Sequence, residues 1–185
     1  EMCIRDRAYA VVTGAGSGIG RSFALELAKR GGDVICADID LSSAQETVDL
    51  IQSMTSTSAY AVHCDVGLKE SVHALAEQAE QLLGHPVTLL INNAGVGLGS
   101  KFDEVSLEDW RWCMHVNLWG VIHGCHYFVP KFKQQGFGAI INVASAAGYT
   151  AAPEMTAYNV TKSSVLALSE TLASELHAYN LSLIH

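Results

Sequence analysis

The sequence lacks any apolar run of the roughly 18 residues that a helix needs to cross a membrane. Residues 1–7 also carry alternating charges, where a secretory signal peptide would need an apolar stretch. We therefore expect neither a membrane partner nor secretion, and we predict a cytoplasmic protein.

Runs of basic residues are missing as well. The formal net charge is −8 at pH 7, and the 11 Lys and Arg residues are dispersed along the chain. Binding to nucleic acids or anionic membranes normally requires a basic patch, so we expect no nucleic-acid partner. A small-molecule ligand fits this charge balance better.

Cysteine is present without a pattern. The chain has five cysteines, an odd number, with no CxxC pair and no histidine cluster at ligand spacing. This excludes a disulfide framework and predicts no metal site. The cysteines are typical of small buried side chains in a reducing compartment.

What is present is an alternation of short apolar runs with longer amphipathic segments. Such alternation is typical of repeated βαβ units around a parallel sheet, and 185 residues with 49% hydrophobic residues suffice for one domain, 1–185. Strands are predicted at residues 9–13, 33–38, 59–64, 88–92 and 138–144. Helices are predicted at residues 18–30, 41–53, 69–83, 107–128 and 155–179.

A glycine-rich run joins the first predicted strand to the first helix. From Thr13 to Gly20 the sequence reads TGAGSGIG, and such glycines allow a tight turn whose backbone N–H groups approach a pyrophosphate. The helix that starts there adds a partial positive charge. An ordinary strand-to-helix turn is the alternative interpretation.

The second predicted strand ends in Asp38, about twenty residues after the glycine run, where a carboxylate can accept hydrogen bonds from a ribose. A carboxylate about 4 Å from a phosphate costs roughly 4 kcal/mol at an effective dielectric constant of 20. Because Ser17 rather than Arg or Lys stands in the glycine run, NAD is predicted over NADP. An exposed aspartate at a strand end is the alternative.

Further motifs stand in a specific order. Three residues separate Gly14 from Gly18, Asp65 and Val66 follow the third strand, residues 92–95 read NNAG, and Tyr158 and Lys162 form a YxxxK pair. With these motifs the chain resembles the short-chain dehydrogenase/reductase family. The resemblance implies the following cofactor-binding residues: Gly14, Ser17, Gly18, Ile19, Gly20, Asp38, Asp65, Val66, Asn92, Ala94, Gly95, Tyr158 and Lys162.

The same resemblance implies a catalytic set of Asn117, Ser145, Tyr158 and Lys162. A second YxxxK match, Tyr127 to Lys131, is interpreted as a decoy for two reasons. Pro130 disfavours the helical turn between its ends, and the position that corresponds to the family serine is Met114. Tyr158 has neither defect.

The expected chemistry explains these residue types. Tyr158 would take the hydroxyl proton of an alcohol, which requires its pKa to fall from about 10 to about 7, or roughly 4 kcal/mol of phenolate stabilisation. Lys162, four residues on, would supply charge. Ser145 would bind the substrate oxygen, and by resemblance Asn117 would hold a water that links Lys162 to solvent. The alternative for Asn117 is a helix asparagine bonded to a nearby backbone carbonyl.

The chain is thus predicted to be an oxidoreductase that transfers a hydride between NAD(P) and an alcohol or ketone. The expected fold is a three-layer α/β Rossmann fold with a doubly wound parallel sheet.

Apolar segments at 96–100 and 146–156 favour an uncharged substrate. The helices at 107–128 and 155–179 resemble those through which family members form dimers or tetramers. An inert NAD-binding fragment or sensor, or a purely structural domain, is the alternative.

The carboxyl end departs from the family pattern, in which the sheet order is 3-2-1-4-5-6-7. We expect this chain to stop before the sixth strand, which would leave residues 138–144 as an unpaired, uncharged edge and the chain marginally stable, with little turnover. Residues 1–7 and 181–185 are interpreted as non-native ends.

Overall fold

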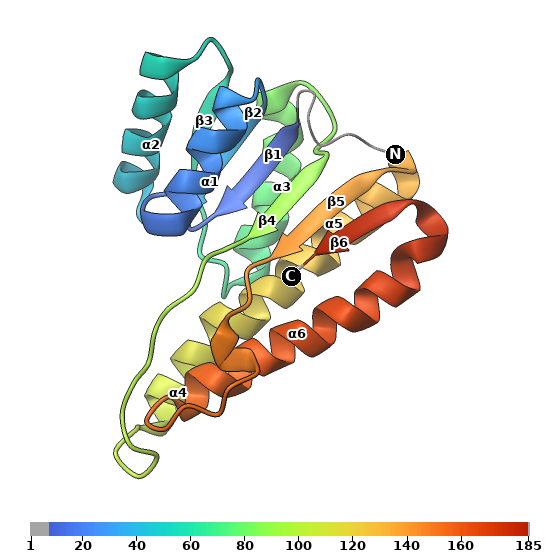
Figure 1. Cartoon of the computed structure of the whole chain (residues 1–185). Coiled ribbons are helices and arrows are strands. Elements are labelled where there is room, and N and C mark those ends of the chain that lie inside the picture. Colours follow the sequence, from blue (N-terminus) through green and yellow to red (C-terminus); the bar gives the residue numbers. More distant parts are fainter. Residues whose placement is uncertain (1–7, 185) are drawn as a thin grey trace.

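The computed structural model describes residues 8–184, and its centre is a parallel sheet of six strands in the order β3-β2-β1-β4-β5-β6 (Figure 1). Chain order and sheet order reverse beside β1, which makes the sheet doubly wound, as predicted. The strands are β1 Tyr9–Thr13, β2 Asp33–Asp38, β3 Ala59–His63, β4 Leu89–Asn92, β5 Gly138–Asn142 and β6 Leu181–Ile184.

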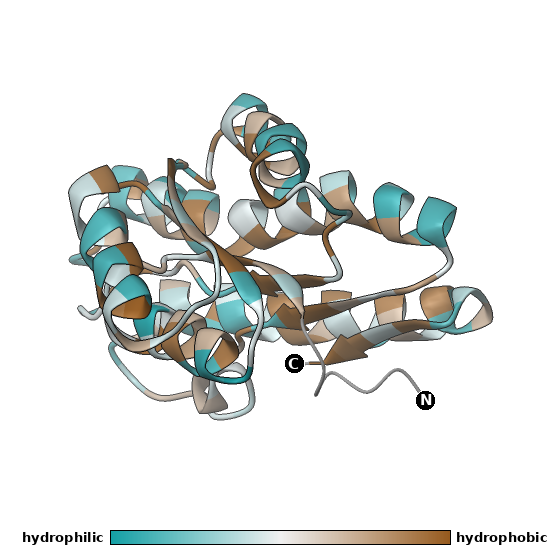
Figure 2. Ribbon diagram, turned by 90° about the horizontal axis from the view of Figure 1, so that it is seen from above, coloured by the Kyte–Doolittle hydropathy of each residue, from teal (hydrophilic) through white to brown (hydrophobic). Residues whose placement is uncertain are grey.

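Helices cover both faces of the sheet, so that the brown apolar strands lie between two helical layers (Figure 2). One core contains side chains of α1 and α2, such as Ala24 and Ile51, and the other contains side chains of α3, α5 and α6, such as Leu75, Phe128 and Val165. The helices are α1 Gly18–Lys29, α2 Leu41–Met54, α3 Lys69–Leu83, α4 Leu107–Met114, α5 Gly120–Gln135 and α6 Thr156–Leu176, with shorter turns η1 His115–Trp119, η2 Ala146–Gly148 and η3 His177–Tyr179. The predicted three-layer fold is confirmed.

The expectation that the chain stops before a sixth strand is wrong. After η3, Asn180 adopts a left-handed conformation with φ of 56°, and Leu181–Ile184 then pairs in parallel with β5 (Figure 1). Leu181 and Leu183 also pack against the core. Strand β5 is therefore not an edge, because a four-residue segment too short to stand out in the sequence acquires its strand geometry from its neighbour. Residues 1–7 and His185 lie outside the described residues.

The single helix expected at 107–128 is three consecutive helical segments. Between α4 and α5 lies η1, a π-helical turn, and α5 runs through Pro130 to Gln135. The expectation that Pro130 breaks this helix is wrong. Proline inside a helix costs about 3 kcal/mol, whereas full burial of Phe128 and Phe132, both 0% exposed, contributes a comparable or larger stabilisation.

Buried polar side chains join β4 and β5 to α6. The Asn92 amide Nδ2 donates to Asn142 Oδ1 (2.9 Å), and Asn142 Nδ2 donates to Ser169 Oγ (2.9 Å). All three residues are at most 3% exposed, so their mutual hydrogen bonds offset the cost of desolvation. Gly124 on α5 leaves room for these hydrogen-bonded side chains, because a Cβ at this position would overlap the Asn92 side chain.

Within residues 8–184, no helix combines the length and the apolar character that crossing a membrane requires.

We predict that Gly124→Ala destabilises the fold by about 2 kcal/mol, measured as the free energy of unfolding in urea. Glycine-to-alanine changes inside helices normally stabilise by up to about 1 kcal/mol, so the sign itself is diagnostic. Gly99→Ala is the control, because its added Cβ would meet only Glu154 O at 3.5 Å. A stabilised Gly124→Ala variant would contradict this account of the Asn92 contacts.

Candidate functional site

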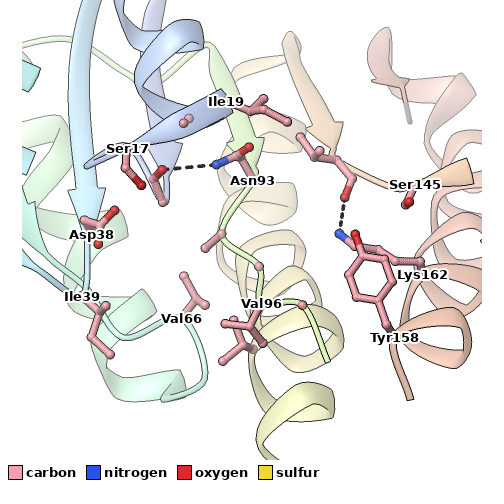
Figure 3. A pocket seen from close by; sticks show the side chains of 18 of the residues that line it. Ser17, Ile19, Asp38, Ile39, Val66, Asn93, Val96, Ser145, Tyr158 and Lys162 are labelled. Atoms are coloured by element: carbon pink, nitrogen blue, oxygen red, sulfur yellow. Dashed lines mark hydrogen bonds between the residues drawn. The ribbon is translucent and has the colours of Figure 1, made fainter. Parts of the chain in front are cut away.

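A cavity of about 670 Å³ lies at the carboxyl ends of the central strands (Figure 3). This is where parallel α/β sheets bind ligands, because the loops that leave neighbouring strands diverge there. It is lined by Gly14, Ser17, Gly18, Ile19, Gly20, Asp38, Ile39, Cys64, Asp65, Val66, Asn93, Ala94, Gly95, Val96, Gly97, Trp112, Val116, Val143, Ala144, Ser145, Tyr158 and Lys162. Of the sequence-predicted site residues, Asn92 and Asn117 are not part of this lining.

The glycine-rich run forms the turn that its composition predicts. Gly14 and Gly18 have positive φ angles of 66° and 52°, and a Cβ on Gly20 would overlap the carbonyl of Gly14. Helix α1 begins directly afterwards, and the Ser17 side chain makes no capping hydrogen bond to it. The first residues of α1 line the cavity, and their backbone N–H groups lack a side-chain cap from Ser17, so an anionic group in the cavity would satisfy them.

A set of hydrogen bonds that the sequence did not reveal holds this turn against the loop after β4. Thr13 Oγ1 accepts hydrogen bonds from the backbone N–H groups of Asn93 (3.0 Å) and Ala94 (3.1 Å). In return, Asn93 Nδ2 donates to the carbonyls of Thr13 (2.9 Å) and Gly14 (3.3 Å), the latter drawn in Figure 3. Both residues belong to motifs quoted from the sequence, but nothing in the sequence indicated that the motifs bond to each other.

Asp38 is half-buried at the end of β2 and points to the cavity (Figure 3). Its Oδ2 accepts the Gly16 N–H (2.8 Å) and its Oδ1 accepts the Asp40 N–H (3.0 Å). In the loop after β3, Asp65 Oδ1 accepts the Gly67 N–H (2.9 Å). Two carboxylates thus stand at one end of the cavity with spare acceptor capacity.

Tyr158, Lys162 and Ser145 lie together at the other end (Figure 3). Lys162 is 4% exposed, its Nζ donates to the carbonyl of Val143 (2.7 Å), and it lies 5.7 Å from the centre of the Tyr158 ring. Burial lowers the pKa of this ammonium group, because desolvation disfavours its charged form. Ser145 Oγ accepts the Ala147 N–H (3.2 Å). This end therefore combines a phenol, a buried ammonium and a hydroxyl.

Asn117 lies beside this group without reaching the cavity. It sits on η1 with 0% exposure, and its side chain brackets Val96: Oδ1 accepts the Val96 N–H (2.7 Å), and Nδ2 donates to the Val96 carbonyl (2.8 Å). Nδ2 also approaches Cys113 Sγ and Thr161 Oγ1, each at 3.4 Å. The side chain thus binds nearby backbone on both its oxygen and its nitrogen, as the alternative interpretation expects, and Oδ1 keeps one further acceptor site.

The second YxxxK match lies outside the cavity lining. Tyr127 stacks on His73 of α3 with ring centres 4.9 Å apart, and Lys131 forms ion pairs of 2.9 Å with Glu77 and Glu80. This pair therefore joins α5 to α3. Of the two reasons given from the sequence, the one that rests on Pro130 was wrong, because α5 continues through this proline. The side chains of Tyr127 and Lys131 nevertheless make contacts away from the cavity.

Four cysteines fall within the described part of the chain, and all four are buried and unpaired: Cys36, Cys64, Cys113 and Cys125. Among residues 8–184, no group of three or more His, Cys, Asp or Glu side chains is placed to hold a metal ion.

Comparison with known proteins gives relatives of similar sequence and structure. The chain is 39% identical over 167 residues to a cyclohexanol dehydrogenase of Acinetobacter, and the match covers 90% of this chain and 66% of that protein. It is 36% identical over 173 residues to the probable oxidoreductase EphD of Mycobacterium tuberculosis, of which it spans 29%. A short-chain dehydrogenase/reductase from Burkholderia phymatum, solved in complex with NAD, superimposes with a TM-score of 0.93 at 39% identity, covering 98% of this chain and 65% of that one.

The model of the short-chain dehydrogenase family matches residues 8–185. This match extends over the whole sheet and both ends of the cavity, in agreement with the resemblance stated from the motifs. The chain therefore belongs to the short-chain dehydrogenase family.

Proposed function

We propose that the chain is the dinucleotide-binding and catalytic part of an oxidoreductase that transfers a hydride between NAD and an alcohol or ketone. One observation carries this proposal: a single cavity has the glycine turn and Asp38 at one end and Ser145, Tyr158 and Lys162 at the other. The related cyclohexanol dehydrogenase and the NAD-bound structure from Burkholderia support it.

The residues at the first end fit a dinucleotide. The pyrophosphate would bind at the turn of Gly14 and Gly18 and at the first N–H groups of α1. The Asp38 carboxylate would accept hydrogen bonds from the hydroxyls of the adenosine ribose. Asp65 and Val66 would border the adenine. NAD, when bound, would supply the acceptor or donor of the hydride beside the second end.

Tyr158 would act as the proton acceptor when an alcohol is oxidised, and as the donor when a ketone is reduced. The carbon would lose a hydride while its hydroxyl proton moves to the Tyr158 oxygen, so the products are a ketone and a phenol. The Lys162 ammonium favours the phenolate electrostatically, and its burial strengthens that effect because little water screens the charge.

Ser145 would donate its hydroxyl hydrogen to the substrate oxygen, because its own oxygen already accepts the Ala147 N–H. Asn117 would position the loop at Val96 on the opposite wall, and by family resemblance would hold a water through which Lys162 returns the proton to solvent. The nearby walls include Val96, Gly97 and Ala144, which suit an uncharged substrate.

We also propose a dimer or tetramer. Large apolar side chains on and near α4, among them Leu107 and Trp119, are 67% and 49% exposed, as expected for helices that pair between subunits. A cytoplasmic location is likewise proposed, supported by the four unpaired cysteines of the described chain.

We predict that NAD binds at least about a hundredfold more tightly than NADP, because the Asp38 carboxylate would lie beside the additional phosphate. Asp38→Ala should remove most of this preference, whereas Asp49→Asn, an exposed change on α2, should leave it intact. Dissociation constants from isothermal titration measure both. Comparable constants for the two cofactors in the unaltered chain would show that Asp38 does not select between them.

We predict that Tyr158→Phe lowers turnover by about a hundredfold or more and changes NAD affinity by less than about twofold, because only the proton-transferring oxygen is removed. Tyr127→Phe is the matched control and should keep normal turnover. The assay follows cofactor absorbance with cyclohexanol and other secondary alcohols, beside an NAD titration. NAD binding without turnover in the unaltered chain would favour the inert NAD-binding alternative.

A further inference from the structure

Arg21, a residue of α1, follows the glycine turn directly and lies outside the cavity lining. Its guanidinium donates to the carbonyls of Gly16 and Ser43, to Thr47 Oγ1 (2.9 Å from Nε) and to Glu46 (3.0 Å). One side chain therefore connects the glycine turn to α2. An arginine is suited to this because its planar fork presents five donors in fixed directions.

Thr47 of α2 completes the arrangement. It is 0% exposed, accepts from Arg21 Nε and donates its hydroxyl hydrogen to the Ala15 carbonyl (2.8 Å). The Arg21–Thr47 clamp, as we name these two side chains, thus holds the carbonyls of Ala15 and Gly16.

The N–H groups of the same two residues are held from the opposite side. The Ala15 N–H donates to the Ala37 carbonyl (3.1 Å), and the Gly16 N–H donates to Asp38 Oδ2 (2.8 Å). Two consecutive residues of the turn are therefore fixed at both ends, by β2 on one side and by the clamp on the other. Because the Gly16 N–H orients the Asp38 carboxylate, movement of Gly16 would also turn Asp38.

We propose that the Arg21–Thr47 clamp is a positioning device for the adenosine half of the bound dinucleotide. It holds Ala15 and Gly16 so that the turn and the Asp38 carboxylate are arranged before the ligand arrives. The inference rests on the proposed NAD binding. Preorganisation of this kind raises affinity because the ordering is not required at the moment of binding.

The ion pair with Glu46 is not the source of the effect. Glu46 is 68% exposed and Arg21 27% exposed at their side chains, and pairs at such exposure contribute little. The bonds to Gly16 and Thr47 are more shielded, and a lysine cannot replace them because its single nitrogen cannot reach acceptors on two sides.

The test compares Arg21→Lys and Thr47→Val with three controls. Arg30→Lys changes an exposed arginine directly after the same helix, Glu46→Gln removes only the charge of the exposed pair, and Thr47→Ser keeps the hydroxyl. We expect Arg21→Lys and Thr47→Val each to weaken NAD and ADP-ribose by the same factor, about tenfold, with turnover at saturating NAD unchanged. The three controls should remain within about twofold.

Hydrogen exchange of the ligand-free chain supplies a second readout. Residues 14–20 should exchange faster in Arg21→Lys and Thr47→Val and at the normal rate in the controls. Unchanged ADP-ribose affinity in both clamp variants, an equal loss in Thr47→Ser, or a parallel loss of turnover at saturating NAD would overturn the proposal. If the unaltered chain bound neither NAD nor ADP-ribose, both the proposed dinucleotide function and the positioning role would be contradicted. Hydrogen exchange of residues 14–20 would still show whether the clamp orders the turn.

Discussion

The Thr13 hydroxyl, buried where β1 ends, is the contact on which the candidate site depends. It accepts two backbone N–H groups from the loop after β4, and Asn93 returns its amide to the carbonyls at the start of the glycine turn. Parallel strands deliver their loops to one edge of the sheet but do not determine how those loops meet. Here the hydrogen bonds join the loop after β1 to the loop after β4, and both loops line the same cavity.

Hydrogen bonds also fix the helices that flank these loops. Helix α6 carries Tyr158 and Lys162, and the chain of Asn92, Asn142 and Ser169 attaches it to the sheet. On the other side Arg21 and Thr47 attach α2 to the glycine turn. In both places buried or partly buried polar groups set the position of a helix, because a misplaced helix would leave them without partners.

Burial of Lys162 has opposing consequences. Desolvation lowers its pKa and so weakens its hold on a proton, while the same lack of water strengthens its field at the Tyr158 oxygen. The hydrogen bond to the Val143 carbonyl compensates part of the desolvation of the ammonium. At 4% exposure the Lys162 amine therefore keeps a hydrogen-bonding partner inside the fold.

The sequence alone determined the features that arise from neighbouring residues: five of the six strands, the glycine turn, the aspartate at the end of β2 and the Tyr158–Lys162 pair. These depend on local geometry and on the alternation of apolar residues. The tertiary structure decided the rest. Leu181–Ile184 becomes a strand only beside β5, Pro130 stays helical because Phe128 and Phe132 are buried, and the roles of Asn117 and Arg21 depend on partners such as Val96 and Thr47. Contacts between distant residues leave no periodic signal in one sequence, because each side chain is selected by a partner that only folding brings near.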